Sequence, residues 1–157
     1  MAHPPAPPYN FSPQVRALLE RAGWYPGRVA DPPVRLPASP SYPPQVLALL
    51  QEFGGLRIEY VHGIKFEPVE VDNEMVAFYS EELGRTLYPL GVSYEYSDVC
   101  IDLNGFVYII GNWVSLAGQT FEDGITQFLT QTSTALHLNK EDMTWGPDRQ
   151  AILPPIA

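Results

Sequence analysis

Apolar residues recur at helical spacing in two segments near the start of the chain. The first segment covers residues 13–22, where Ser12 can cap a helix and Gly23 can end it. The second covers residues 44–53. The stripes that we expect to be buried consist of Val15, Leu18, Leu19 and Ala22 in the first helix and of Val46, Leu49, Leu50 and Phe53 in the second.

The spacing of apolar residues changes at Gly54-Gly55. Beyond this pair, Leu56, Ile58 and Tyr60 occupy alternate positions, which is typical of a strand. We expect Gly54 to take the left-handed conformation that ends the second helix, because glycine has no Cβ to oppose a positive φ. The junction therefore joins a helical N-terminal part to a sheet.

Further elements follow along the chain. A short return strand is predicted at 64–66, a third helix at 73–83 between an Asp72 cap and Gly84, and an extended segment at 86–92. Thr120, with Asp123 three residues later, resembles a capping box and predicts a last helix. Its buried stripe would be formed by Phe121, Ile125, Phe128 and Leu129.

The strongest hairpin signal joins residues 99–103 to residues 106–110 across Asn104-Gly105. A two-residue turn would pair Ile101 with Tyr108. Alternatively, Asp102 could start a type I turn with a glycine bulge at Gly105. The two registers differ by one residue, which exchanges the faces of the strand. The two-residue turn is slightly favoured.

These elements predict one α+β domain, in which helices pack on a twisted, mainly antiparallel sheet. Residues 1–10 are rich in proline and are interpreted as a flexible arm. The domain is expected at 11–132. The pattern fades afterwards, so 133–157 is expected to be an extended or partly disordered tail.

Composition narrows the class of protein. The chain has 157 residues, which suits one domain with a core, and a single cysteine, which excludes an internal disulfide. No apolar leader and no apolar segment of membrane-spanning length is present. We therefore expect a soluble, cytoplasmic protein without contact to a membrane.

The net charge of −9 is unevenly distributed. Arg85 is the only lysine or arginine between Lys65 and Lys140, an interval with many carboxylates. Such a field disfavours nucleic acid and attracts a basic protein. The acidic residues taken alone could also serve only to keep the protein soluble, which is the commoner reason for an acidic surface.

The sequence offers little for catalysis. Cys100 lies in a predicted strand, where a small buried hydrophobe is the usual interpretation, and no cysteine or histidine spacing indicates zinc. Asp98 and Asp102 share one strand face, but surface carboxylates beside a hairpin are commoner than a metal site or an acid–base pair. His62 lacks a partner nearby in the chain. We expect no enzyme, no metal and no cofactor.

Several segments together resemble the third family of the SUKH superfamily of bacterial immunity proteins. They cover about residues 11–129 and comprise Phe11-Ser12-Pro13, Ala22-Gly23-Trp24-Tyr25-Pro26-Gly27-Arg28, Glu52-Phe53-Gly54-Gly55-Leu56-Arg57-Ile58, Glu82-Leu83-Gly84-Arg85-Thr86-Leu87-Tyr88-Pro89-Leu90-Gly91, Ile101-Asp102-Leu103-Asn104-Gly105-Phe106-Val107-Tyr108 and Thr120-Phe121-Glu122. The resemblance implies an α+β domain that neutralises a cognate protein toxin, commonly a nuclease or a nucleic-acid deaminase. It carries over no catalytic residues.

The resemblance and the charge together predict an acidic monomer or weak homodimer that covers the basic face of a toxin. The predicted partner-binding residues are acidic or aromatic: Glu67, Glu70, Glu74, Tyr94, Glu95, Tyr96, Asp98, Asp102 and Trp113. The alternative function is a non-enzymatic adaptor or regulatory module on the same fold.

Overall fold

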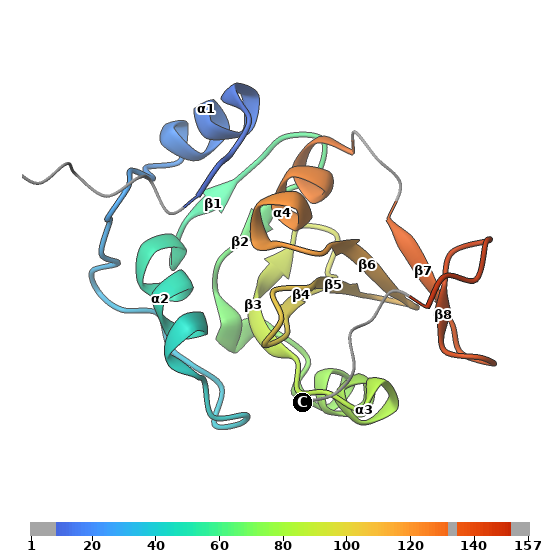
Figure 1. Cartoon of the computed structure of the whole chain (residues 1–157). Coiled ribbons are helices and arrows are strands. Elements are labelled where there is room, and N and C mark those ends of the chain that lie inside the picture. Colours follow the sequence, from blue (N-terminus) through green and yellow to red (C-terminus); the bar gives the residue numbers. More distant parts are fainter. Residues whose placement is uncertain (1–8, 132–134, 152–157) are drawn as a thin grey trace, which may run out of the picture.

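The computed structural model describes residues 9–131 and 135–151, and it confirms the α+β class. The strands form an antiparallel meander in which each strand pairs with its neighbour in the chain (Figure 1). The strands are β1 (Arg57–Ile58), β2 (Ile64–Lys65), β3 (Tyr88–Ser93), β4 (Asp98–Ile101), β5 (Val107–Ile110), β6 (Val114–Gly118), β7 (Leu136–Asn139) and β8 (Thr144–Trp145).

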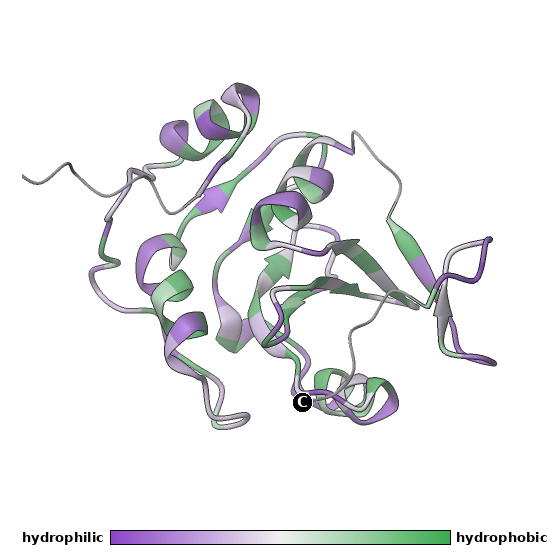
Figure 2. Cartoon of the chain, in the orientation of Figure 1, coloured by the Kyte–Doolittle hydropathy of each residue, from purple (hydrophilic) through white to green (hydrophobic). Residues whose placement is uncertain are grey.

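The described residues form four α-helices and one 3-10 turn. Their bounds are α1 (Pro13–Arg21), α2 (Pro44–Phe53), η1 (Pro68–Glu70), α3 (Asn73–Leu83) and α4 (Phe121–Thr130). The three predicted caps are confirmed, because the side chains of Ser12, Asp72 and Thr120 each accept a hydrogen bond from a backbone N–H of the first turn. The hydropathy colouring shows apolar residues gathered on the central strands and on the inner sides of the helices (Figure 2).

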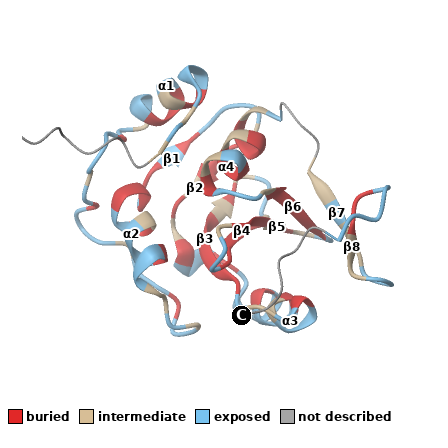
Figure 3. Cartoon of the chain, in the orientation of Figure 1, coloured by how far each residue is buried: buried red, intermediate tan, exposed pale blue. Residues whose placement is uncertain are grey.

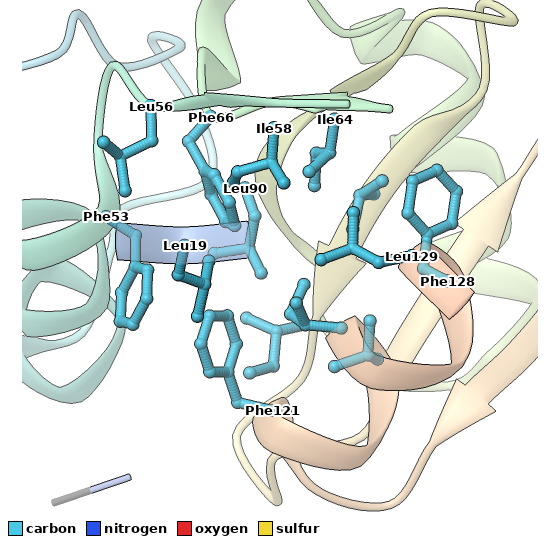
Figure 4. Close-up of a cluster of buried hydrophobic side chains, with 14 of the residues drawn as sticks. Leu19, Phe53, Leu56, Ile58, Ile64, Phe66, Leu90, Phe121, Phe128 and Leu129 are labelled. Atoms are coloured by element: carbon cyan, nitrogen blue, oxygen red, sulfur yellow. The ribbon is translucent and has the colours of Figure 1, made fainter. Parts of the chain in front are cut away.

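One face of the sheet packs against α1, α2 and α4. Phe53 of α2 is fully buried, and its ring lies 4.9 Å from that of Phe121 and 5.8 Å from that of Trp24. Figure 4 shows Leu19, Phe53, Phe121 and Leu129 converging from the three helices on the strands. Burial of each such side chain contributes about 1.5–3 kcal/mol relative to exposure, so this cluster holds the helical layer to the sheet.

The other face of the sheet packs against α3 and the β7–β8 hairpin. Trp145 of β8 is fully buried, with its ring 6.0 Å from that of Tyr108 on β5. The Lys140 ammonium lies 5.0 Å from the ring of Tyr79 and so connects the hairpin to α3. Because both faces are covered, the central strands are buried almost throughout (Figure 3).

The ends of the chain add to this core. Of the proposed arm at 1–10, residues 1–8 lie outside the described residues, while the Tyr9 ring packs 5.1 Å from that of Phe53. The β7–β8 hairpin was not predicted, since its strands are short and its apolar residues are few. Trp145 nevertheless brings the hairpin into the second core.

The prediction for Gly54 was wrong in its conformation. Gly54 has φ −55° and ψ 137°, and the positive φ of 81° falls at Gly55. Gly54 is required for space, because a Cβ there would lie 2.3 Å from the Leu50 carbonyl oxygen and 2.8 Å from Val34 Cγ1. Arg28 Nη1 donates to the carbonyls of Glu52 and Gly54 at 2.7 and 3.0 Å and so completes the helix end.

The favoured hairpin register was also wrong. Ile101 pairs with Val107, and Cys100 pairs with Tyr108. Asp102 decides the register, because its Oδ1 accepts hydrogen bonds from the N–H groups of Asn104 and Phe106 at 2.8 and 3.0 Å. Gly105, with φ 90°, then supplies the bulge of the alternative register.

We predict that Gly54→Ala lowers the free energy of unfolding by about 3 kcal/mol, because the added Cβ meets backbone that cannot move freely. Gly55→Asn is the matched control. Nothing lies within 4 Å of a Cβ at Gly55, and asparagine tolerates the left-handed region, so this variant should lose less than about 1 kcal/mol. Urea unfolding of both variants checks the order, and an equal loss at the two positions would contradict it.

Candidate protein-binding site

The turn between β3 and β4 is built around the side chain of Ser93. Its Oγ accepts hydrogen bonds from the backbone N–H groups of Glu95 and Ser97 at 3.2 and 2.9 Å. The Ser93 N–H donates to the Ser97 carbonyl at 2.8 Å, and the Tyr96 N–H donates to the Ser93 carbonyl at 3.1 Å. Residues 94–97 are therefore held in one shape although they project from the sheet.

This turn presents Tyr96 to solvent. The Tyr96 side chain is 94% exposed, the largest exposure among the large hydrophobic residues described. Its backbone has φ 67°, a conformation that is uncommon for a bulky residue and that costs free energy. An exposed tyrosine on a backbone that is held in one shape is the kind of residue that anchors protein interfaces.

Beside the turn lies a hollow of about 290 Å³. It brings together four of the predicted partner-binding residues, namely Glu70, Tyr94, Tyr96 and Asp98. Sequence reasoning did not select the other lining residues, which are Lys65, Asp72, Val92 and Ser93. We call this hollow, with the turn at 94–97, the tyrosine–carboxylate hollow.

Asp98 is the buried acid of the tyrosine–carboxylate hollow. It is only 7% exposed, and its Oδ2 accepts a hydrogen bond from the Asp72 N–H at 3.2 Å. Burial raises the pKa of Asp98 to about 6; the Asp72 N–H opposes this shift, and the Asp72 carboxylate adds to it. The interpretation of Asp98 as a surface carboxylate was therefore wrong.

Asp102, at the other end of the same strand, is 3% exposed and was also wrongly interpreted as a surface residue. Its Oδ2 accepts a hydrogen bond from the Tyr108 hydroxyl at 2.7 Å and lies 3.4 Å from Arg85 Nη1. The Asp102 side chain thus binds protein groups at both oxygens. It is a structural residue, and we do not include it in the proposed interface.

Glu95 points to a second hollow of about 250 Å³ on the other side of the turn. Its Oε1 lies 2.9 Å from His62 Nδ1, and the other ring nitrogen of His62 contacts the Gln131 side chain. His62, for which the sequence showed no nearby partner, thus has one 33 residues away. This contact holds a partly exposed acid beside Tyr96.

The remaining predicted residues, Glu67, Glu74 and Trp113, do not line the hollow. Glu67 lies 3.3 Å from Arg57, and Glu74 is exposed in the first turn of α3. Trp113, 57% exposed in the turn between β5 and β6, packs edge-to-face on His137 with ring centres 5.5 Å apart. If the hollow is the centre of an interface, these three residues would lie at its edge.

Between Lys65 and Lys140, exposed acidic residues far outnumber exposed basic residues. Arg85, the one basic residue between Lys65 and Lys140, has only 9% of its side chain exposed and faces Asp102. The exposed acids of the interval, in contrast, are Glu70, Asp72, Glu74, Glu81, Glu82, Glu95 and Asp123. The basic groups beside these acids are fewer: Lys65 lines the hollow, Arg57 pairs with Glu67, and Lys140 lies against α3. The acids therefore give the region around the hollow an excess of negative charge.

Within residues 9–131 and 135–151, no group of three or more histidine, cysteine or acidic side chains could hold a metal ion. No helix in the same part of the chain is long and apolar enough to cross a membrane.

The fold is therefore an antiparallel meander covered on both faces, with the tyrosine–carboxylate hollow beside the turn after β3. A family model described as the SUKH-3 immunity protein matches residues 11–131, and the chain belongs to that family. Comparison with curated proteins and with solved structures gave no match. The match ends before the β7–β8 hairpin.

We predict that Asp102→Asn destabilises the fold by about 3–5 kcal/mol, because it removes the charge that faces Arg85 in the interior. Tyr108→Phe, which deletes one hydrogen bond to the same carboxylate, should cost about 1–2 kcal/mol. Chemical unfolding of both variants measures the difference. A cost of less than 1 kcal/mol for Asp102→Asn would show that Asp102 does not have this structural role.

Removal of the charge of Asp98 should stabilise the fold, in contrast to removal of the charge of Asp102. The native pKa of Asp98, about 6, lies above the usual value of 3.8, so above pH 6 the native state holds an ionised, poorly solvated carboxylate. Asp98→Asn should therefore raise the free energy of unfolding by about 2 kcal/mol at pH 7.5, and the gain should shrink as the pH falls from 6 to 4. Thermal unfolding at several pH values measures this gain. Asp148→Asn, at an exposed position, is the control, and a gain independent of pH would contradict the assignment.

Proposed function

We propose that this protein binds a cognate toxin of the same cell and neutralises it by direct contact through the tyrosine–carboxylate hollow and its acidic surroundings. The observation that carries the proposal is the exposed Tyr96, on a turn held by Ser93, at a hollow with three carboxylates. Membership of the SUKH-3 immunity protein family supports an immunity role. The protein acts in the cytoplasm, where its toxin partner is made.

The charge of the surface indicates the chemistry of the partner. A toxin that acts on nucleic acid must approach phosphates, so its active face carries basic side chains. Carboxylates of Glu70, Asp72 and Glu95 around the hollow offer such a face the same sign of charge as its substrate. The protein then works by occupying the active face, and it needs no reaction, metal or cofactor of its own.

Tyr96 is expected to be the anchor of the complex. A tyrosine ring buries a large area and loses little conformational entropy when its backbone is already fixed. The hydrogen bonds of Ser93 hold the turn in shape before binding, so binding does not have to order the loop and loses no affinity to that entropy cost. The acidic residues around Tyr96 act mainly on the rate of association.

The direct test expresses the toxin encoded beside this gene together with each variant and measures growth. Tyr96→Ala should lose protection and weaken binding by about 2 kcal/mol or more, which is the usual cost of deleting an interface anchor. Tyr25→Ala is the matched control, because Tyr25 is also exposed, at 58%, but lies in the turn after α1. Equal protection by the two variants would remove Tyr96 from the interface.

The charges are tested by association kinetics. The double variant Glu70→Lys/Glu95→Lys should associate with the toxin several-fold more slowly at low salt. The difference should be smaller at high salt, because salt screens the long-range attraction that speeds association. Glu20→Lys on α1 is the control. If the native protein does not restore growth against the toxin at all, the immunity proposal fails and the adaptor function takes its place.

A further inference from the structure

Asp98 lines the hollow and keeps one carboxylate oxygen without a donor from the described residues, although the residue is only 7% exposed. Among the described residues, its Oδ2 accepts one bond, from the Asp72 N–H, and Oδ1 accepts none. Buried carboxylates are normally satisfied by several donors or by a cation. Asp102 on the same strand shows the normal case, with hydrogen bonds at both oxygens.

The walls around Asp98 are suited to a cation. Glu70 and Asp72 place two more carboxylates on the hollow, against the single ammonium of Lys65. The Lys65 Nζ already lies 5.4 Å from the centre of the Tyr94 ring, so that ring can accept positive charge on its face. Tyr96, which is 94% exposed, also lines the hollow and supplies a second aromatic ring.

The geometry favours a guanidinium group over other cations. Its planar fork can donate two parallel hydrogen bonds to a carboxylate while its face stacks on a tyrosine ring, which an ammonium cannot do. A metal ion does not fit, because the acids here are not close enough to one another to form a metal-binding group. The three carboxylates also exclude a phosphate or another anion.

We propose that the tyrosine–carboxylate hollow is a binding pocket for one arginine side chain of the partner protein, with Asp98 and Asp72 as acceptors and Tyr96 as the stacking surface. The proposal rests on the proposed function, since the toxin is the protein that supplies the arginine. The volume of about 290 Å³ suits a single side chain better than a cofactor. The turn residues are fixed beforehand, so the pocket exists in the free protein.

The pocket can be tested without the toxin. The probe is N-acetyl-arginine amide, added to the full chain while the backbone amide resonances are followed by NMR. We expect saturable shifts at millimolar concentrations, centred on Asp72 and on residues 93–98. N-acetyl-citrulline amide has the same shape without the charge and should produce no saturable shift, and N-acetyl-lysine amide should bind several-fold more weakly.

Asp98→Asn is the decisive variant, because it removes the charge, keeps an acceptor for the Asp72 N–H and is expected to be folded. It should abolish saturation by the arginine probe, while Asp148→Asn should leave it unchanged. The proposal is overturned if citrulline or lysine binds as well as arginine, if the shifts map elsewhere, or if Asp98→Asn binds as before.

The outcomes separate the pocket from the function. If the arginine probe binds but the protein fails to protect against the toxin, the pocket stands and the proposed immunity function fails. If the protein protects but the probe does not bind, the function stands and the arginine pocket is excluded.

Discussion

Strand β4 is buried on both faces, begins with Asp98 and is followed directly by Asp102. The different hydrogen bonds of these two carboxylates shape the structure around them. Asp102 receives two backbone N–H groups, a tyrosine hydroxyl and a guanidinium, and it fixes the hairpin that follows. Asp98 receives a single N–H, and its pKa is raised to about 6. Of these two aspartates, Asp102 stabilises the fold, whereas the ionised, buried Asp98 costs free energy of folding. Costly polar groups of this kind concentrate where proteins bind or react.

The layers of the fold leave the connections, rather than the sheet faces, to meet solvent. Helices α1, α2 and α4 cover one face of the sheet, and α3 with the β7–β8 hairpin covers the other, so no broad sheet surface is open (Figures 1 and 3). The connections then carry the surface chemistry. The hydrogen bonds of Ser93 give the turn after β3 a fixed shape, and the Asp72–Asp98 bond holds the start of α3 beside it.

The sequence could predict what depends on near neighbours in the chain. Helical periodicity located α1 and α2, and three caps followed from residues within one turn of each helix. Four residues of the hollow followed from charge and aromatic character alone. Contacts across the fold could not be predicted. Asp98 bonds Asp72, Asp102 faces Arg85 in addition to its local partners, and Glu95 contacts His62, across 26, 17 and 33 residues. The space needed at Gly54 depends on Val34 from another loop.

The central claim is that the free protein already holds an acidic, tyrosine-bearing surface that a basic protein covers. Hydrogen–deuterium exchange of the protein with and without its cognate toxin measures this surface most directly. The account predicts new protection at residues 93–98 and 70–72, with no change in the apolar groove formed by Val29, Leu36 and Leu47 beside α2. Protection confined to that groove, with unchanged exchange in the turn of Tyr96, would contradict it.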